Sequence, residues 1–318
     1  MSMKIAIPFR HHATHICDEA RKMMTDAGFE LVCNNTGRVL DFDEQKAMIK
    51  DAFAVIAGTE KYDAAMLEGC DNLKIIMRFG VGVDNFDLEA MKRQGIQVGV
   101  IANYNAVAEF TLMLILSAMK NLPQLDHAVR DGKWSRFPMC ELSGKTVGLV
   151  GFGRIGRRLA ELLAGFDVHL LAYDPYMNDE EAHKRNVEPV TFHELLGRSD
   201  VVSLHLPSTE ETFHIMNKET LGLMKDGAYL INTSRGKLVD EKALYEALTT
   251  GKLRAAGLDV YENEPVKTPD NVLFSLENTS LTPHTAAITY ETNYNGGIIC
   301  ANSIISVLQG GRPVHPVL

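Results

Sequence analysis

Residues 145–156 read Lys-Thr-Val-Gly-Leu-Val-Gly-Phe-Gly-Arg-Ile-Gly, and this stretch decides the fold. Its first half has the apolar character of a buried strand, and Arg157–Leu163 follows it with a helical pattern. The glycines form a G-x-G-x-x-G turn in which Gly151 permits a sharp bend, Gly153 lets a pyrophosphate approach, and Gly156 lets the helix pack closely. The N-terminus of the helix supplies free N–H groups for phosphates. The stretch therefore predicts a dinucleotide-binding strand, turn and helix.

An acidic residue after the next predicted strand narrows the choice of cofactor. Asp174 follows Val168–Tyr173 and lies 23 residues beyond Gly151, close to the ~20 residues at which dinucleotide folds place the acid that binds the ribose hydroxyls. A 2′-phosphate would meet this negative charge, and Pro175 and Tyr176 offer no guanidinium to offset it. We therefore expect NAD rather than NADP. The alternative is a glycine-rich strand-to-helix turn in some other α/β fold.

Short apolar runs alternate with helix-length segments along the whole chain, which is typical of parallel sheets with crossover helices. A first series of predicted strands comprises Lys4–Phe9, Glu30–Cys33, Ala54–Gly58, Leu73–Phe79 and Gln97–Ile101. A second series comprises Thr146–Val150, Val168–Tyr173, Val201–Leu206, Ala228–Asn232, Ala256–Val260 and Ser280–Leu281. We therefore expect an α/β fold of two Rossmann-like or flavodoxin-like parallel-sheet domains with a cleft between them.

The length of 318 residues also favours two domains, because single cores stop growing near 250 to 300 residues. The long apolar segment Asn105–Leu122 is predicted to be one helix that connects them, and Tyr290–Leu308 is predicted to be a final helix that packs back on the first unit. These patterns predict a discontinuous substrate domain, residues 1–101 plus 288–318, and an NAD-binding domain, residues 102–287.

Composition excludes several classes of protein. With 46% hydrophobic and 23% charged residues the chain has the average composition of a soluble globular protein. Its net charge of -9 argues against a nucleic-acid partner, because such proteins need a clustered basic surface. The five cysteines show no C-x-x-C spacing, so we expect no metal site and a reducing compartment. The start lacks a signal peptide and no apolar run spans a bilayer, so we expect a cytoplasmic protein without a membrane partner.

Three reactive side chains each follow the end of a predicted strand, where open α/β sheets bind ligands. Arg235 lies in Asn-Thr-Ser-Arg-Gly, Glu264 in Tyr-Glu-Asn-Glu-Pro, and His284 in Thr-Pro-His. Each has a simpler explanation: a surface arginine, one carboxylate of an acidic loop, and a histidine satisfied after a proline. The residues alone leave both interpretations open.

Eight blocks of sequence stand in a recognisable order along the chain. They are Arg78–Asn85, Asn105–Glu109, Glu141–Gly148, Gly151–Gly156, His205–Pro207, Ile231–Gly236, Leu258–Val260 with Glu264–Pro265, and Pro283–His284. Together they resemble the D-isomer-specific 2-hydroxyacid dehydrogenases, and within that family the short D-3-phosphoglycerate dehydrogenases. One departure is Val98–Ile101, where such relatives usually run Asn-Thr-Pro-Gly. This segment is expected near the hinge and the cleft wall.

The resemblance implies an NAD-dependent oxidoreductase that acts on CH–OH groups and transfers a hydride. Arg235 matches the arginine that binds the substrate carboxylate, a task that suits the two parallel donors of a guanidinium. His284 matches the acid–base residue, which gives a proton to the developing alkoxide. Glu264 matches the carboxylate paired with that histidine. These three are the predicted catalytic residues.

The remaining contacts are also implied by the resemblance and by the glycine motif. The predicted cofactor-binding residues are Gly151, Gly153, Arg154, Ile155, Gly156, Asp174, His205, Pro207, Thr212, Thr233 and Asp259. His205 is expected to be a contact rather than a proton carrier, and Asp259 to act largely through its neighbours. The predicted substrate-binding residues, besides Arg235, are Gly80, Val81 and Gly82, whose backbone N–H groups would complete the carboxylate site. The resemblance also implies a homodimer.

The substrate is less well determined than the reaction. A phosphorylated acid calls for a basic residue in the loop after Ala54–Gly58. Lys61 is available there and Arg78 precedes the glycine loop, and both are predicted substrate contacts, although either could be a surface or ion-paired residue. We expect D-3-phosphoglycerate, with hydroxypyruvate or glyoxylate reduction or a D-lactate-type activity as the alternatives. A hypothesis of another class is a non-catalytic NAD-sensing scaffold, as in corepressors that share these residues. Turnover of a 2-keto acid would distinguish the two classes.

Overall fold

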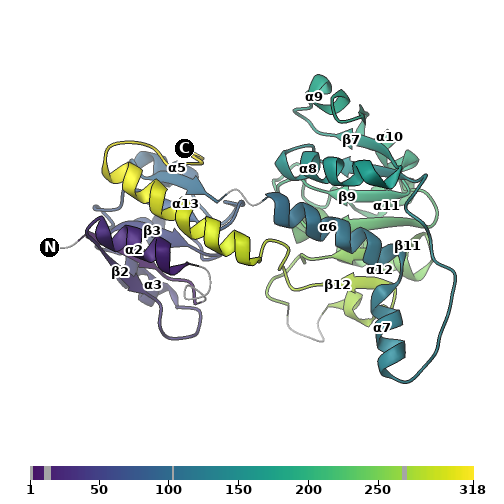
Figure 1. Cartoon of the computed structure of the whole chain (residues 1–318), viewed down its shortest axis with the longest axis horizontal. Helices are drawn as coiled ribbons and strands as arrows, with labels where there is room; N and C mark the ends of the chain where they lie inside the picture. The colour runs from purple at the N-terminus through teal and green to yellow at the C-terminus, as the bar shows by residue number, and fades with distance from the viewer. Residues whose placement is uncertain (1–2, 11–15, 102–103, 267–270) are drawn as a thin grey trace. The chain divides into compact units, whose positions relative to one another are not determined.

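The computed structural model describes residues 3–10, 16–101, 104–266 and 271–318. The chain divides into two compact units (Figure 1), of which unit 1 comprises residues 1–103 and 288–318 and unit 2 comprises residues 104–287. Each unit holds one parallel sheet with helices on both faces. The predicted α/β fold of two parallel-sheet domains is therefore confirmed.

Unit 1 contains a five-stranded parallel sheet in the order β2-β1-β3-β4-β5. Its strands are β1 (Met3–Ile7), β2 (Phe29–Cys33), β3 (Ala52–Ala57), β4 (Ile75–Arg78) and β5 (Gln97–Val100). The direction of strand addition reverses between β1 and β3. In open α/β sheets such a switch point leaves a crevice outside the carboxyl ends of the strands.

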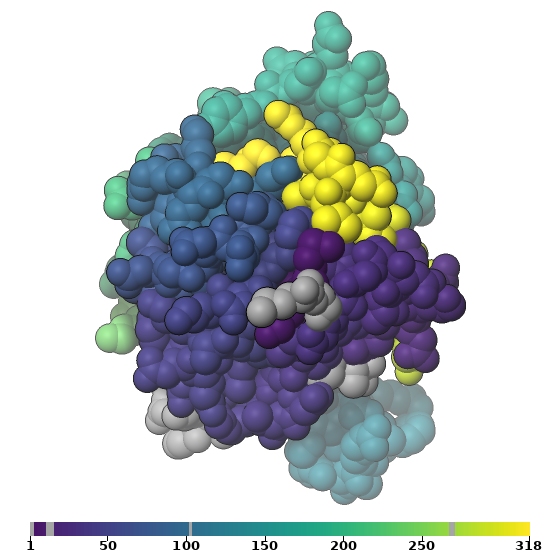
Figure 2. Space-filling view, turned by 90° about the vertical axis from the view of Figure 1, so that its left-hand side faces the viewer, coloured from purple at the N-terminus to yellow at the C-terminus, as the bar shows by residue number. Residues whose placement is uncertain are grey.

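Alternating side chains of these strands feed two hydrophobic cores. Ile5 and Ile7 face the core beneath α2 (Asp18–Asp26) and α13 (Tyr290–Leu308), whereas Ala6 faces the opposite core. That opposite face is covered by α3 (Phe42–Ile49), α4 (Ala64–Leu67) and α5 (Leu88–Arg93). Figure 2 shows the C-terminal helix in yellow beside the purple N-terminal part, as the contacts between α13 and α2 require.

The departure at Val98–Ile101 has a packing explanation within unit 1. Most of the segment belongs to β5, where the last residues of the chain bond to it: Gly99 bridges to Pro316, and the Val317 N–H donates to the Val98 carbonyl at 2.8 Å. A Cβ at Gly99 would lie 2.6 Å from Met77 Sδ. Only glycine fits while the C-terminal segment covers this edge of the sheet.

Unit 2 contains a seven-stranded parallel sheet in the order β12-β11-β10-β9-β6-β7-β8. Its strands are β6 (Thr146–Val150), β7 (His169–Tyr173), β8 (Val187–Pro189), β9 (Val201–Leu204), β10 (Ala228–Asn232), β11 (Leu253–Leu258) and β12 (Thr279–Leu281). The order reverses between β6 and β9, so the switch point lies beside the glycine turn that follows β6. The sequence did not predict β8, a three-residue strand at the edge of the sheet.

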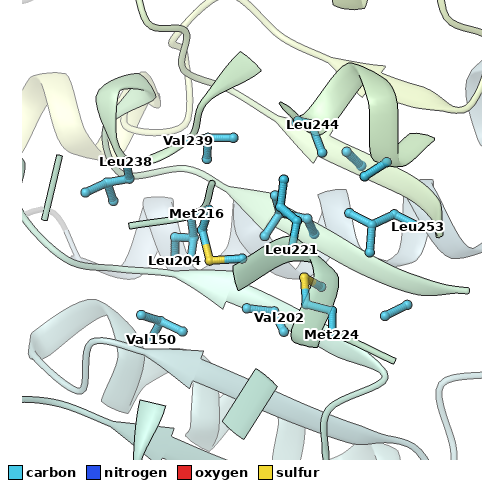
Figure 3. Close-up of a cluster of buried hydrophobic side chains, with 14 of the residues drawn as sticks. Val150, Val202, Leu204, Met216, Leu221, Met224, Leu238, Val239, Leu244 and Leu253 are labelled. Carbon is cyan, nitrogen blue, oxygen red and sulfur yellow. The ribbon is translucent and has the colours of Figure 1, made fainter. Parts of the chain in front are cut away.

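Helices cover both faces of this sheet. Residues of α6 (Tyr104–Met119) and α8 (Arg154–Leu163) fill one core, and α10 (Phe192–Arg198), α11 (Lys218–Leu223) and α12 (Glu241–Thr249) fill the other. This second core includes Met216, Leu221 and Leu244 together with the strand residues Val202 and Leu204, all of which Figure 3 labels. The remaining short elements are α7 (Leu122–Arg130), α9 (Asp179–His183) and the 3-10 turns η1 (Ala164–Phe166), η2 (Gly236–Leu238) and η3 (Val272–Ser275).

The prediction of a single helix over Asn105–Leu122 is wrong at its C-terminal end. The helix α6 stops at Met119, and a second helix, α7, starts at Leu122 after a left-handed Asn121 (φ 48°). Pro123 stands in the first turn of α7, where its missing N–H costs no hydrogen bond. Within the described residues no single helix could cross a membrane. The pair α6 and α7, bent by 65°, reaches the necessary length and apolar character only together.

Candidate active site

The glycine turn after β6 is built so closely that side chains cannot replace two of its glycines. Gly151 has φ +102°, and a Cβ there would lie 2.8 Å from the carbonyl carbon of His205, which follows β9. A Cβ at Gly156 would lie 2.4 Å from the carbonyl oxygen of Gly151. The turn thus brings the start of α8 directly over the end of β6.

Gly153 differs from its two neighbours, because a Cβ there would meet no heavy atom within 4 Å. It is the residue before α8, and no side chain caps that helix. The N–H groups at the start of the helix, which include those of Arg154 and Ile155, have no intrahelical acceptor. Open space over uncapped N–H groups fits a pyrophosphate.

The Asp174 carboxylate is held at the same turn. Its Oδ2 accepts the Phe152 N–H at 2.8 Å, and its Oδ1 accepts the Tyr176 N–H at 2.8 Å. Each carboxylate oxygen has a second lone pair, so both can still accept a hydroxyl. These two backbone bonds fix the orientation of the carboxylate at the turn, and its charge would disfavour a 2′-phosphate bound beside it.

The other predicted cofactor contacts lie in the loop after β9 and at the end of β10. Burial lowers the pKa of His205 to about 4, so its ring is neutral at neutral pH and does not act as a proton donor. The Thr212 hydroxyl donates to the Pro207 carbonyl at 2.7 Å. The Thr233 hydroxyl is buried and lies 2.7 Å from that of Thr111 in α6. Both threonines therefore also stabilise the unit itself.

Arg235 stands on a rigid loop after β10. The Asn232 side chain receives the Ser234 N–H at 3.0 Å and donates to the Arg235 carbonyl at 2.9 Å. A Cβ at Gly236 would lie 1.8 Å from the Tyr261 carbonyl oxygen, so the loop packs backbone to backbone on the segment after β11. Sequence reasoning missed Asn232, although an asparagine that ends a strand before Thr-Ser is a turn signal.

Glu264 and His284 form the pair that the sequence predicted. Glu264 Oε2 lies 2.6 Å from His284 Nδ1, and its Oε1 accepts the Tyr261 N–H at 2.8 Å. Burial alone would raise the pKa of Glu264. The hydrogen bond and charge of His284, the Tyr261 N–H and the charge of Arg235 outweigh burial and hold the pKa below its usual value. The structure thus brings Arg235, Glu264 and His284 together within unit 2.

The backbone of His284 adopts a left-handed conformation, with φ +52°, and Asp259 holds it there. Asp259 is fully buried, and its own carbonyl accepts the His284 N–H at 2.7 Å. Its carboxylate accepts three hydrogen bonds, from the Thr282 hydroxyl at 2.6 Å and from the N–H groups of Thr285 and Ala286 at 2.9 Å. In this structure Asp259 therefore stabilises the loop that carries His284.

The predicted substrate loop, residues 80–82, follows β4 in unit 1. Arg78 lies beneath this loop, where it donates from Nη1 to the Phe79 carbonyl at 2.9 Å and from Nε to the Gly82 carbonyl at 3.0 Å. A Cβ at Gly80 would lie 3.0 Å from this guanidinium. Arg78 therefore stabilises the conformation of this loop through hydrogen bonds to its backbone.

Lys61, the other residue proposed for a phosphate, is 77% exposed and lies 2.8 Å from the Asp63 carboxylate. That ion pair is one of the simpler explanations that the sequence allowed. An exposed pair of this kind is screened by water and contributes little to stability, so it does not fix the lysine firmly. Lys61 and Arg78 therefore stay predictions as phosphate contacts.

The sequence of this chain is similar to those of known 2-hydroxyacid dehydrogenases. Residues 112–286 match the sequence model of the family described as "D-isomer specific 2-hydroxyacid dehydrogenase, NAD binding domain". The chain is 44% identical over 260 residues to D-3-phosphoglycerate dehydrogenase of Archaeoglobus fulgidus, which is 80% of this chain and 49% of that protein. It is 40% identical over 280 residues to glyoxylate reductase of Korarchaeum cryptofilum, covering 85% and 83% of the two chains.

A solved structure agrees with these sequence matches. The TT0316 protein of Thermus thermophilus superposes with a TM-score of 0.88 at 32% identity, over 99% of this chain and all of that one. The chain spans about half the length of the D-3-phosphoglycerate dehydrogenases that it matches first, 49% and 56%. The expectation that unit 2 binds NAD is confirmed by the family match.

Proposed function

This chain belongs to the D-isomer specific 2-hydroxyacid dehydrogenase family, as its sequence blocks indicated, and we propose that it interconverts a D-2-hydroxy acid and the matching 2-keto acid with NAD. The observation that carries the proposal is the 2.6 Å pair of Glu264 and His284, with the charge of Arg235 acting on the same carboxylate. When held at the glycine turn, the nicotinamide cofactor would supply the hydride acceptor for oxidation and the hydride donor for reduction.

Arg235 binds the carboxylate of the substrate. A planar guanidinium makes two parallel charge-assisted hydrogen bonds to a carboxylate, which fixes position and orientation together. Its loop is held by Asn232 and Gly236, so the guanidinium starts from a restricted set of positions and less entropy is lost on binding.

His284 moves the proton. Because Glu264 accepts at Nδ1, Nε2 is the nitrogen that faces the substrate oxygen. During reduction Nε2 gives a proton to the developing alkoxide, and during oxidation it takes the proton from the hydroxyl. The lowered pKa keeps Glu264 ionised, so its negative charge stabilises the imidazolium form that donates.

The other contacts remain proposals of the same kind. The glycine turn with Arg154, Ile155 and Asp174 would hold NAD, as would His205, Pro207, Thr212, Thr233 and Asp259, the last by supporting its loop. Residues 80–82 of unit 1 would donate backbone N–H groups to the substrate. A homodimer would cover large apolar side chains exposed on and after α7, which are Leu122, Val129, Trp134 and Met139. The cytoplasm stays the location expected from sequence.

Two substrates are supported by different observations. D-3-phosphoglycerate, the substrate expected from sequence, is favoured by the name of the relative at 44% identity. A small unphosphorylated acid is favoured by the glyoxylate reductases, which share 83% and 80% of their length with the chain at 40% and 41% identity. The test of the function is steady-state NADH oxidation with glyoxylate, hydroxypyruvate, 3-phosphohydroxypyruvate and pyruvate. Failure to turn over any of them would favour the NAD-sensing scaffold.

Arg235→Ala is expected to lower kcat/KM for the best keto acid by at least about 150-fold, because it removes two charge-assisted hydrogen bonds of roughly 1.5–3 kcal/mol each. The affinity for NADH, measured by fluorescence titration, should change less than twofold. Arg235→Lys should recover only part of the loss, since an ammonium cannot make the two parallel bonds. Arg254→Ala removes an exposed arginine of the same unit and serves as the control. An equal loss of NADH affinity in Arg235→Ala would show that the arginine serves the cofactor instead.

A further inference from the structure

The loop after β3, where a phosphorylated substrate would require a cation, also holds a carboxylate, that of Glu60. Glu60 is the third residue after β3 and lies at the carboxyl end of the unit 1 sheet. The strand order reverses between β1 and β3, so Glu60 marks the switch point at which open α/β sheets bind their ligands. The residue next to it, Lys61, points its ammonium group to Asp63 instead.

The main chain fixes Glu60 against the predicted substrate loop. The Asn85 side-chain amide donates to the Glu60 carbonyl, and the Tyr62 N–H donates to the Asn85 carbonyl at 2.9 Å. Tyr62 is fully buried and stacks edge-on against Phe86. Glu60 is thus attached to the segment that directly continues the glycine loop, residues 80–82, and is not part of a free loop tip.

The side chain of Glu60 is held by the backbone and is partly removed from water. Its Oε2 accepts the Gly58 N–H at 2.7 Å. Burial raises the pKa of Glu60, and this effect exceeds the opposing ones of its backbone hydrogen bonds and of the Arg78 charge. The carboxylate has therefore lost much of its water, no residue that the structure describes forms an ion pair with it, and it retains lone pairs for a donor.

A second anion close to such a group is unfavourable. Two negative charges near a partly desolvated site repel more strongly than they would in water, and a phosphate monoester carries a charge of about -1.5 to -2 at neutral pH. A hydroxyl group has the opposite effect, because it donates a hydrogen bond to the carboxylate and brings no charge.

We propose that Glu60 sets the substrate class of this chain by accepting a hydrogen bond from an uncharged hydroxyl at the far end of a 2-hydroxy or 2-keto acid and by disfavouring a phosphate there. This inference rests on the proposed function. It selects hydroxypyruvate and D-glycerate over their 3-phospho forms, and it assigns the specificity to a residue that binds substrate without taking part in the proton transfer.

The experiment compares kcat/KM for hydroxypyruvate and 3-phosphohydroxypyruvate in the wild type, Glu60→Gln, Glu60→Asp and Glu89→Gln. The wild type should prefer hydroxypyruvate by at least tenfold. Glu60→Gln should reduce this preference by about tenfold, largely through a lower KM for the phosphorylated acid, whereas Glu60→Asp should stay closer to the wild type. Glu89→Gln removes an exposed charge from α5 of the same unit and should leave the preference unchanged.

Glyoxylate, which has no far-end group, separates this inference from the proposed function. Its turnover should vary less than threefold among the four proteins. A wild type that prefers 3-phosphohydroxypyruvate overturns the inference, whatever the variants do, and so does an unchanged preference in Glu60→Gln while glyoxylate is still reduced. If no keto acid is reduced by the wild type, the proposed function itself fails and the inference fails with it.

Discussion

Replacement of His284 by alanine is expected to lower kcat for the best keto acid by about 10³-fold, within the range of roughly 10²–10⁴ that a positioned acid–base residue contributes. The loss is expected in both directions, because one nitrogen gives the proton in reduction and takes it in oxidation. Glu264 would then lose its hydrogen-bond donor but keep the Tyr261 N–H. The effect should therefore appear in kcat, measured by stopped-flow under single-turnover conditions with saturating NADH.

A matched histidine is available as the control. His127 in α7 has a 78% exposed side chain and pairs with Asp131 at 3.4 Å, so His127→Ala should reduce the keto acid at nearly the normal rate. NADH affinity should be unchanged in both variants. A His284→Ala protein that retains more than about a tenth of wild-type kcat would contradict the proton-transfer role.

Gly236→Ala is expected to lower the free energy of unfolding by about 3 kcal/mol or more, at the upper end of what overpacking costs. The new Cβ would lie 1.8 Å from the Tyr261 carbonyl oxygen and 1.9 Å from its carbon. Both atoms belong to the backbone, which cannot rotate away as a flexible side chain can. Urea unfolding followed by circular dichroism measures the change, and any folded fraction should also have a raised KM, because η2 must shift next to Arg235.

Gly222→Ala provides the comparison for this effect. Gly222 lies within α11, where a Cβ would meet nothing within 4 Å. Alanine there should leave stability unchanged or raise it by about 0.5–1 kcal/mol through helix propensity. If Gly236→Ala unfolded at the same urea concentration as the wild type, the backbone-to-backbone packing described for this loop would be wrong.

Strands with strong local patterns could be predicted from sequence, often to the residue. Thr146–Val150 and Ala228–Asn232 are runs of apolar residues bounded by polar ones, and both match β6 and β10. The edge strand β8 has three residues, too few for any periodicity. The break between α6 and α7 was missed because a left-handed Asn121 leaves no mark in the apolar pattern.

Residues of the site could likewise be predicted where a local motif marks them, and could not where contacts distant in sequence place them. The glycine turn and Asp174 could be identified from their spacing within one compact motif, whereas Glu264 and His284 were identified through the family resemblance. Glu60 could not be identified in either way, because its importance comes from a strand order that reverses beside it and from Asn85, which is distant in sequence. Charge alone directed attention to Lys61, which the structure places in an exposed pair.

The left-handed backbone of His284 sets catalytic activity against thermal stability at one position. A non-glycine residue in that conformation costs on the order of 1 kcal/mol, which the surrounding hydrogen bonds must offset. Glycine would relieve this cost and remove the imidazole at the same time. A screen that rewards heat resistance alone would therefore tend to discard the residue to which we assign the proton transfer, so laboratory evolution of this chain should select for activity and stability together.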